Sequence, residues 1–81
     1  MVITAELSLY PLKADYVPTI QSYIEKLHQF EGIEVRTHAL STEVFGEFSQ
    51  VMKAVQAATQ PVFEHDQAAV LVAKYLNKDR R

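Results

Sequence analysis

The sequence predicts one α+β domain with the element order β-α-β-β-α-β. Apolar and polar residues alternate near both ends of the chain and in its middle, which indicates strands. Two intervening segments repeat apolar residues every three or four positions, as amphipathic helices do. The 81 residues suffice for one domain only. We therefore expect residues 1–81 to form a ferredoxin-like domain, in which four antiparallel strands carry both helices on one face.

The first strand is predicted from Val2 to Tyr10. Its apolar side chains fall on one face of the strand: Ile3, Ala5, Leu7 and Leu9. The alternate positions would lie on the opposite face: Thr4, Glu6, Ser8 and Tyr10. Pro11 should end the strand, because proline has no N–H to give to a neighbouring strand.

The first helix is predicted to follow, with Asp15 as its N-cap. Pro18 then falls in the first turn, where a proline is tolerated. Its apolar stripe contains Val17, Ile20, Tyr23, Ile24, Leu27 and Phe30. Gly32 suits the C′ position, at which a left-handed residue closes a helix.

The rest of the chain reads as a hairpin, a second helix and a closing strand. The hairpin strands are predicted at Ile33–His38 and Ser41–Phe45, with Gly46 as a break. Ser49 is a candidate cap for the second helix, and Pro61 should end or kink that helix. The closing strand, Gln67–Leu76, is apolar on both faces at its middle, which predicts that both faces are covered.

Composition excludes several classes of function. The formal charge is −2, from 8 basic and 10 acidic residues, which does not favour a nucleic-acid partner. The chain has no cysteine and its three histidines are not spaced as ligands, so we expect neither a metal site nor a cofactor. No apolar run approaches the ~20 residues that span a bilayer, so a cytoplasmic protein without a membrane partner is expected.

Both helices would cover one face of the sheet and leave the other open. The open face would contain Glu6, Ser8, Tyr10, Glu34, Arg36, His38, Glu43, Phe45, Val70 and Val72. An exposed face with apolar side chains is normally an interface or the floor of a ligand site, so a homo-dimer or homo-tetramer is expected. Glu6 lies in the middle of a strand and needs a partner. It either pairs with Arg36 or Lys74, or it receives a cationic or amino-bearing ligand.

Few residues point to catalysis. The serines are scattered, and the two glycines form no phosphate-binding loop. Glu6 and Glu43 could act as an acid–base pair, although carboxylates on an open face are more often solvated or interfacial. The first loop has neither the CxxC of a copper chaperone nor the arginine of an acylphosphatase.

Two segments resemble the YkoF-like family of thiamine-binding proteins. Residues 5–12, AELSLYPL, are similar to the family's opening AExSLYPLG. Residues 39–47, ALSTEVFGE, are similar to its MSTxxxG stretch, which likewise precedes the second helix. The chain departs from the pattern at Lys13, where the family has glycine, and at Leu40, where it has methionine.

The resemblance implies a ferredoxin-like fold, dimers or tetramers, no catalysis, and binding of thiamine or its hydroxymethylpyrimidine half. It implies ligand contacts by Glu6, Ser8, Tyr10, Ser41, Thr42 and Phe45. Serine and threonine hydroxyls would serve the edge of the aminopyrimidine, and an aromatic ring would stack on it. Glu6 or Glu43 would balance the thiazolium charge.

Two other interpretations stay open. The domain could be a structural or regulatory oligomerisation module without a ligand. It could also be a small enzyme that uses Glu6 or Glu43 as a base. A cavity lined by Glu6, Ser8 and Thr42 would favour the ligand-binding interpretation over both.

Overall fold

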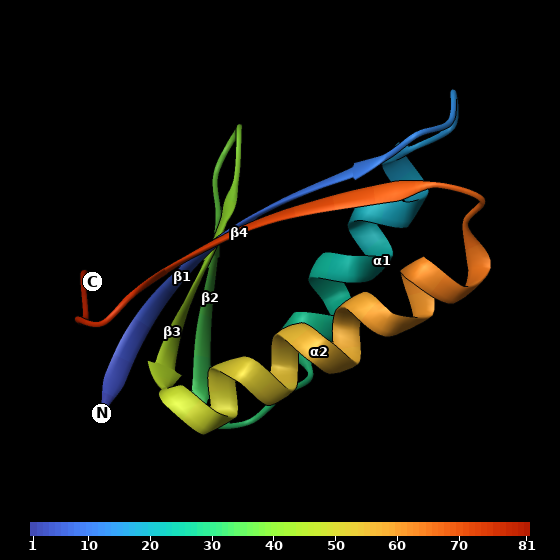
Figure 1. Ribbon diagram of the computed structural model, residues 1–81. Coiled ribbons are helices and arrows are strands. Elements are labelled where there is room, and N and C mark those ends of the chain that lie inside the picture. The colour runs from blue at the N-terminus through green and yellow to red at the C-terminus, as the bar shows by residue number, and fades with distance from the viewer.

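The element order β-α-β-β-α-β is confirmed in a computed structural model, which describes residues 1–81 (Figure 1). The strands and helices have these bounds: β1 Val2–Pro11, α1 Val17–His28, β2 Ile33–Thr37, β3 Thr42–Glu47, α2 Phe48–His65 and β4 Ala69–Leu76. The strands form one sheet in the order β2-β3-β1-β4, and every neighbouring pair is antiparallel. Both helices lie on the same face of this sheet (Figure 1), which confirms the ferredoxin-like fold.

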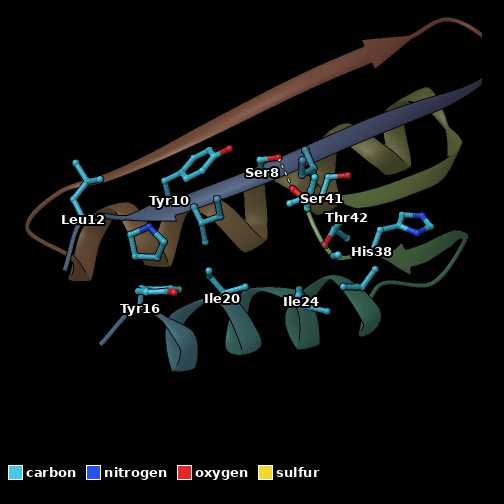
Figure 2. A pocket seen from close by; sticks show the side chains of 15 residues that line it. Ser8, Tyr10, Leu12, Tyr16, Ile20, Ile24, His38, Ser41 and Thr42 are labelled. Atoms are coloured by element: carbon cyan, nitrogen blue, oxygen red, sulfur yellow. Dashed lines mark hydrogen bonds between the residues drawn. The ribbon is translucent and has the colours of Figure 1, made fainter. Parts of the chain in front are cut away.

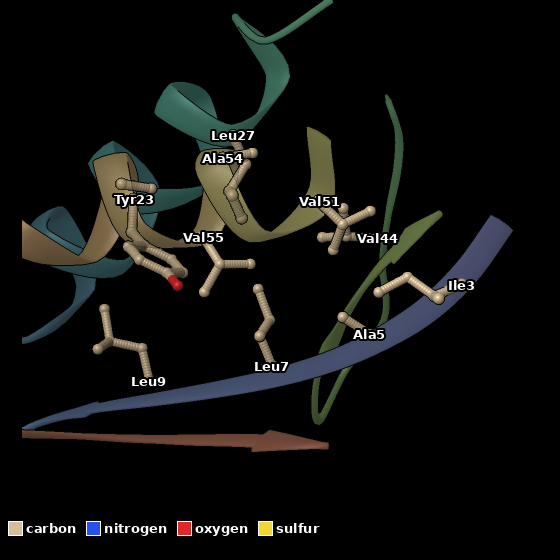
Figure 3. Packing of buried hydrophobic residues seen from close by; sticks show 11 residues of the cluster. Ile3, Ala5, Leu7, Leu9, Tyr23, Leu27, Val44, Val51, Ala54 and Val55 are labelled. Carbon is tan, nitrogen blue, oxygen red and sulfur yellow. The ribbon is translucent and has the colours of Figure 1, made fainter. Parts of the chain in front are cut away.

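The hydrophobic core lies between the helices and one face of the sheet (Figure 3). Cross-strand partners project to the same face, so the pairs Ala5–Val44 and Leu7–Thr42 fix which side chains point toward the helices. Both partners of each pair are buried. The helices complete this core with Tyr23 and Leu27 from α1, and with Val51, Ala54, Val55 and Ala58 from α2.

The two central strands are paired over different lengths. β1 pairs with β3 from Val2 to Leu7, but with β4 from Thr4 to Pro11. The last four residues of β1, Ser8–Pro11, therefore have a strand partner on one side only. Figure 1 shows β1 and β4 running on together past the β2–β3 hairpin.

Helix α1 begins and ends differently from the prediction. Its N-cap is Tyr16 rather than Asp15, and no side chain caps the helix. The helix ends at His28 with Gln29 as C-cap, so Gly32 is not the C′ residue. Gly32 instead has a φ of +82° in the turn before β2, where its lack of a Cβ permits this conformation. Pro18 does lie in the first turn, as predicted.

Helix α2 also departs from the prediction. It begins at Phe48, before Ser49, and it continues through Pro61 to His65. A proline removes one backbone hydrogen bond from a helix. Here Ala58 and Thr59, which precede Pro61, are buried. Val62, which follows it, is partly buried and packs against the core. The packing of this last stretch thus favours a continuous helix. Neither helix is apolar enough over sufficient length to cross a membrane.

The open face of the sheet is covered at one end only. Val70 and Val72 of the edge strand β4 are 46% and 44% exposed, so the predicted cover on both faces of β4 is absent within this chain. At the other end, the C-terminal residues return across β1. The Thr4 hydroxyl donates to the Lys78 carbonyl at 2.8 Å and accepts from the Arg80 N–H at 3.0 Å.

Gly46 was predicted to break the chain after β3, but it lies within that strand. It pairs with Ile3 of β1 and with Ile33 of β2. A Cβ at this position would lie 2.8 Å from the Gly32 carbonyl oxygen and 3.1 Å from a methyl carbon of Ile33. The glycine is therefore required by the close approach of two backbones.

We expect Gly46→Ala to lower the free energy of unfolding by about 1–3 kcal/mol, because β2 must move away to admit the methyl group. Urea unfolding followed by circular dichroism measures this change. Ala57→Gly, at an exposed position of α2, is the control. It measures an alanine–glycine difference, about 1 kcal/mol, at a position where the methyl group meets no other atom group closely. An unchanged urea midpoint for Gly46→Ala would contradict this prediction, because the strands would then admit the methyl group without any loss of stability.

Tyr23 connects the two helices through the core. Its hydroxyl and that of Thr59 are hydrogen-bonded at 3.0 Å, and both residues are almost fully buried. Burial raises the pKa of the Tyr23 phenol above its ordinary value of 10.0, although the bond to Thr59 opposes this shift. The pKa of Tyr75 is also raised by burial. Because the folded protein holds these protons more tightly, their contribution to stability is present below pH 10 and is lost as the pH rises through the folded pKa.

We expect Tyr23→Phe to cost about 1–2 kcal/mol at pH 7, because the buried Thr59 hydroxyl loses its partner. Above pH 10 the variant should lose stability less steeply than the wild type. Urea unfolding at pH 7, 9 and 10.5 tests both statements. Tyr16→Phe, at an exposed position, should cost little stability at pH 7, and a pH slope for Tyr23→Phe equal to that of the wild type would refute the assignment.

Candidate functional site

The main pocket of the molecule opens at the unpaired edge of β1. Its volume is about 560 Å³, and 15 residues line it (Figure 2). They come from the end of β1 and the segment after it, from the start of α1, and from the β2–β3 hairpin. The pocket exists because β3 begins only at Thr42, which leaves the end of β1 without a neighbour on that side.

Both faces of β1 contribute to this pocket. Leu7, Leu9 and Pro11 come from the helix-facing side of the strand, while Ser8 and Tyr10 come from the opposite side. A paired strand separates its two faces, whereas a cavity at an unpaired edge reaches side chains of both. Ile20 and Ile24 of α1 form the facing apolar wall (Figure 2).

One end of the pocket is aromatic. Tyr10 and Tyr16 lie at this end on opposite sides of β1, Tyr10 on the side away from α1 and Tyr16 beside α1, with Leu12 near them (Figure 2). These three side chains are 52%, 49% and 62% exposed, so they form the mouth of the pocket. Two aromatic rings at a partly open mouth suit a flat ring that stacks or a cation that lies over them.

The other end is polar and lies against the β2–β3 hairpin. The Ser8 hydroxyl donates to the Leu40 carbonyl at 3.3 Å, and the Ser41 hydroxyl donates to a Glu6 carboxylate oxygen at 3.1 Å. Thr42 is buried beside Leu7, and its hydroxyl makes no side-chain hydrogen bond within the chain. This end of the pocket thus offers hydroxyl groups to the edge of a ligand.

No lysine, arginine, aspartate or glutamate lines the pocket. Two carboxylates lie just behind its polar end, where each contacts a lining residue. Glu6 accepts from Ser41, and Glu43 is 2.6 Å from Nε2 of His38. The surroundings therefore suit a neutral or cationic ligand better than an anion. No group of three or more histidine, aspartate or glutamate side chains is placed to hold a metal ion.

The predicted site residues separate into two groups. Ser8, Tyr10, Ser41 and Thr42 line the pocket. Three other predicted residues do not: Glu6, Glu43 and Phe45. The strand register explains this division, because Glu6, Glu43 and Phe45 lie where β1 and β3 are paired, whereas the pocket begins where this pairing ends.

Glu6 has found partners within the chain. One carboxylate oxygen accepts from Ser41, and the other lies 3.8 Å from the Lys74 ammonium. Of the two cations expected for Glu6, Lys74 is the one nearby, since Arg36 pairs with Glu34. The Glu6 side chain is 45% exposed, so its charge also keeps contact with water and does not require a ligand.

Phe45 is not an exposed stacking platform. It is only 1% exposed and lies beneath two guanidinium groups, those of Arg36 at 5.2 Å and Arg81 at 5.5 Å from the ring centre. Arg81 also pairs with Asp79, and this interaction lowers the pKa of the Asp79 carboxyl to about 2. The chain end thus covers the ring that the sequence suggested for a ligand.

Sequence reasoning missed the contribution of α1. Ile20 and Ile24 belong to the apolar stripe, from which a role in the core was expected. In the structure only Tyr23 and Leu27 of this helix are fully buried, because the sheet above Ile20 and Ile24 lacks β3. The sequence carries no separate signal for the two isoleucines, because an apolar helix stripe has the same spacing whether it faces a core or a pocket.

The sequence profile of a family described as thiamine-binding protein matches residues 5–79. No curated protein matches the chain. Among solved structures, a hypothetical protein from Methanocaldococcus jannascii is similar with a TM-score of 0.84 and 23% identity, over 99% of this chain and 84% of the other. A Streptococcus pneumoniae protein has a TM-score of 0.88 and 20% identity, over 98% of this chain and 89% of the other.

A third similar structure comes from Thermotoga maritima and is described provisionally as a thiamine biosynthesis or salvage protein. Its TM-score is 0.83 and its identity 22%, over 96% of this chain and 85% of the other. At these identities the structural similarity shows the fold alone. The family assignment depends on the sequence profile, which covers nearly the whole chain.

Proposed function

This chain belongs to the thiamine-binding protein family, and we propose that its pocket at the edge of β1 binds thiamine or its hydroxymethylpyrimidine half. One observation carries the proposal: aromatic side chains and hydroxyl groups, with no lysine, arginine, aspartate or glutamate among them, line a pocket of about 560 Å³. This volume lies within the range of roughly 300–1,000 Å³ typical of small-molecule sites. The family membership supports thiamine as the compound to test first.

The aminopyrimidine is flat, with apolar faces and polar edges. Its faces would pack between the β1 leucines and the isoleucines of α1, which approach the pocket from opposite sides. Its edge would meet the hydroxyls of Ser8, Ser41 and Thr42 and the backbone of β1, which has no strand partner there. The ring would thus take the place of the missing stretch of β3.

The thiazolium is cationic and would lie toward the mouth. Tyr10 and Tyr16 offer ring faces there, and a cation over an aromatic ring gains about 0.5–2 kcal/mol. Glu6 and Glu43 do not touch the pocket, so their role would be a favourable field rather than direct contact. This changes the role predicted for both carboxylates from the sequence.

We propose binding without catalysis. The alternative enzyme would use Glu6 or Glu43 as a base, but neither carboxylate lines the pocket. A general base must lie within hydrogen-bond reach of the proton that it removes. The role provisionally given to the Thermotoga maritima protein suggests that the ligand would be held for salvage or transport. A cytoplasmic location remains a prediction from the sequence.

The open face favours a second role as the interface of a homo-dimer or homo-tetramer. Its uncovered part, between β1 and β4, exposes Tyr10, Val70, Val72 and Leu76. These side chains lie on one face, because the register pairs Tyr10 with Val70, Ser8 with Val72 and Thr4 with Leu76. A second copy of the chain would bury this apolar stripe. Ligand binding and assembly would be coupled, because Tyr10 belongs to both surfaces.

We expect calorimetric titration with thiamine and with hydroxymethylpyrimidine to show saturable binding in the micromolar range, or about −8 kcal/mol. Thr42→Val keeps the shape of the side chain but removes its hydroxyl, and should weaken binding about tenfold. Glu6→Gln should weaken thiamine, which carries the cation, more than the uncharged pyrimidine.

Ser22→Ala, at an exposed position of α1 outside this pocket, is the matched control and should bind as the wild type does. The thiazole half alone should bind weakly. Folded protein that binds neither thiamine nor hydroxymethylpyrimidine would refute the proposed ligand and favour the oligomerisation module.

For the interface, we expect Val72→Glu to shift the protein toward the monomer, because a carboxylate would then face the same patch on the second copy. Sedimentation equilibrium gives the mass. Gln56→Glu, at an exposed position of α2, adds the same charge on the helix side and should leave the mass unchanged. A wild-type protein that is monomeric at micromolar concentration would contradict this role of the open face.

A further inference from the structure

The segment between β1 and α1, Leu12–Tyr16, forms the rim of the pocket mouth. Its two end residues line the pocket, and all five of its residues are exposed. Burial therefore contributes little to holding this segment, and exposed segments with few contacts open at low free-energy cost. Its position depends on a small number of polar contacts.

Few contacts tie this segment to the rest of the molecule. The Leu12 N–H donates to the Ala68 carbonyl at 3.0 Å, at the end of the ladder between β1 and β4. Asp15 does not cap α1, whose N-terminus has no side-chain cap. The segment's one side-chain hydrogen bond runs from the Lys13 ammonium to Asp66 Oδ1, at 3.2 Å. Lys13 thus links the pocket mouth to the far end of α2.

Asp66, the partner of Lys13, is fixed in position by the end of α2. It is the C-cap residue of α2, and its N–H donates to the Val62 carbonyl at 2.9 Å. Its side chain is only 10% exposed, whereas that of Lys13 is 43% exposed. Its second oxygen, Oδ2, is buried without any partner. A nearly buried carboxylate with a single cationic partner is stabilised by that partner, so Asp66 holds Lys13 in place.

The same region contains a smaller hollow of about 280 Å³ between the first turns of α1 and the end of α2. Thr19 and Ser22 face it from α1, and His65 and Asp66 face it from α2. The start of α1 is therefore not packed tightly against α2 at this point. Asp66, the partner of Lys13, lines this hollow.

We infer that the Lys13–Asp66 ion pair is a latch that holds Leu12 and Tyr16 over an occupied pocket and sets the rate at which the ligand leaves. This inference rests on the proposed function. Neither Lys13 nor Asp66 lines the pocket, so both are positioning residues that act through the rim. The latch acts at the end of the pocket where Leu12 and Tyr16 are 62% and 49% exposed.

The test compares Lys13→Met, which keeps an apolar stem without the charge, with Lys13→Arg, which restores a cation. Lys53→Met on α2 is the control, because Lys53 is exposed and forms no ion pair. Hydrogen exchange of residues 12–20 in the ligand-free protein reports on the rim. Stopped-flow tyrosine fluorescence reports on thiamine release, since the chain has no tryptophan.

Lys13→Met should exchange faster at the rim and release thiamine about five- to tenfold faster, because the rim then opens at a lower free-energy cost. Lys13→Arg and Lys53→Met should behave as the wild type does. The double variant Lys13→Met/Asp66→Asn removes the buried charge and should regain stability, yet its release should remain fast. Raising the salt from about 0.05 to 0.5 M should speed release from the wild type but not from Lys13→Met.

Unchanged rim exchange in Lys13→Met, with normal thiamine binding, would overturn the latch and leave the proposed function standing. Faster exchange with unchanged release would also overturn it, because the segment would then move without governing the ligand. A wild-type protein that binds no thiamine would overturn the proposed function and, with it, the role of the pair in release.

Discussion

The pocket depends on a difference in backbone pairing. β1 has partners on both sides from Thr4 to Leu7, but from Ser8 to Pro11 it has β4 alone. An unpaired strand edge leaves N–H and C=O groups that need other partners. The hairpin connection, the start of α1 and the Leu12–Tyr16 rim gather around this edge and enclose space instead of filling it. A β3 strand longer by a few residues would complete the sheet and abolish the cavity.

The alternating pattern of β1 therefore serves the core, the contact with the C-terminal residues and the pocket. Its first half places Ile3 and Ala5 in the core on one side, and Thr4 beneath the C-terminal residues on the other. Its second half uses both faces for the pocket. This dual use explains why Ser8 is only partly buried and Tyr10 is exposed, although both belong to a central strand of the sheet. It also couples the cavity to the open face of the sheet through the two faces of one strand.

Much of the fold could be predicted from alternation and helical spacing, because burial on one face imposes a regular pattern. The order of the elements and the placement of Leu7 and Leu27 in the core follow from it. The end of α2 did not, since packing around Pro61 outweighs a local rule that disfavours proline. The candidate site was only half predicted. Sequence motifs indicated Ser8 and Ser41, but strand register, which local patterns do not fix, excluded Phe45 from the pocket and admitted Ile24.

The two chain ends lie together, at the end of β1 remote from its pocket. The amino group of Met1 pairs with Glu47 at 2.9 Å, and the C-terminal residues contact Thr4, whereas the cavity begins only at Leu7 and extends to Leu12 (Figure 1). A fluorescent reporter or a surface linker joined to either terminus would therefore lie away from the mouth. This arrangement makes the domain a convenient recognition element for a sensor, in which the attached reporter and the entering ligand do not compete for space.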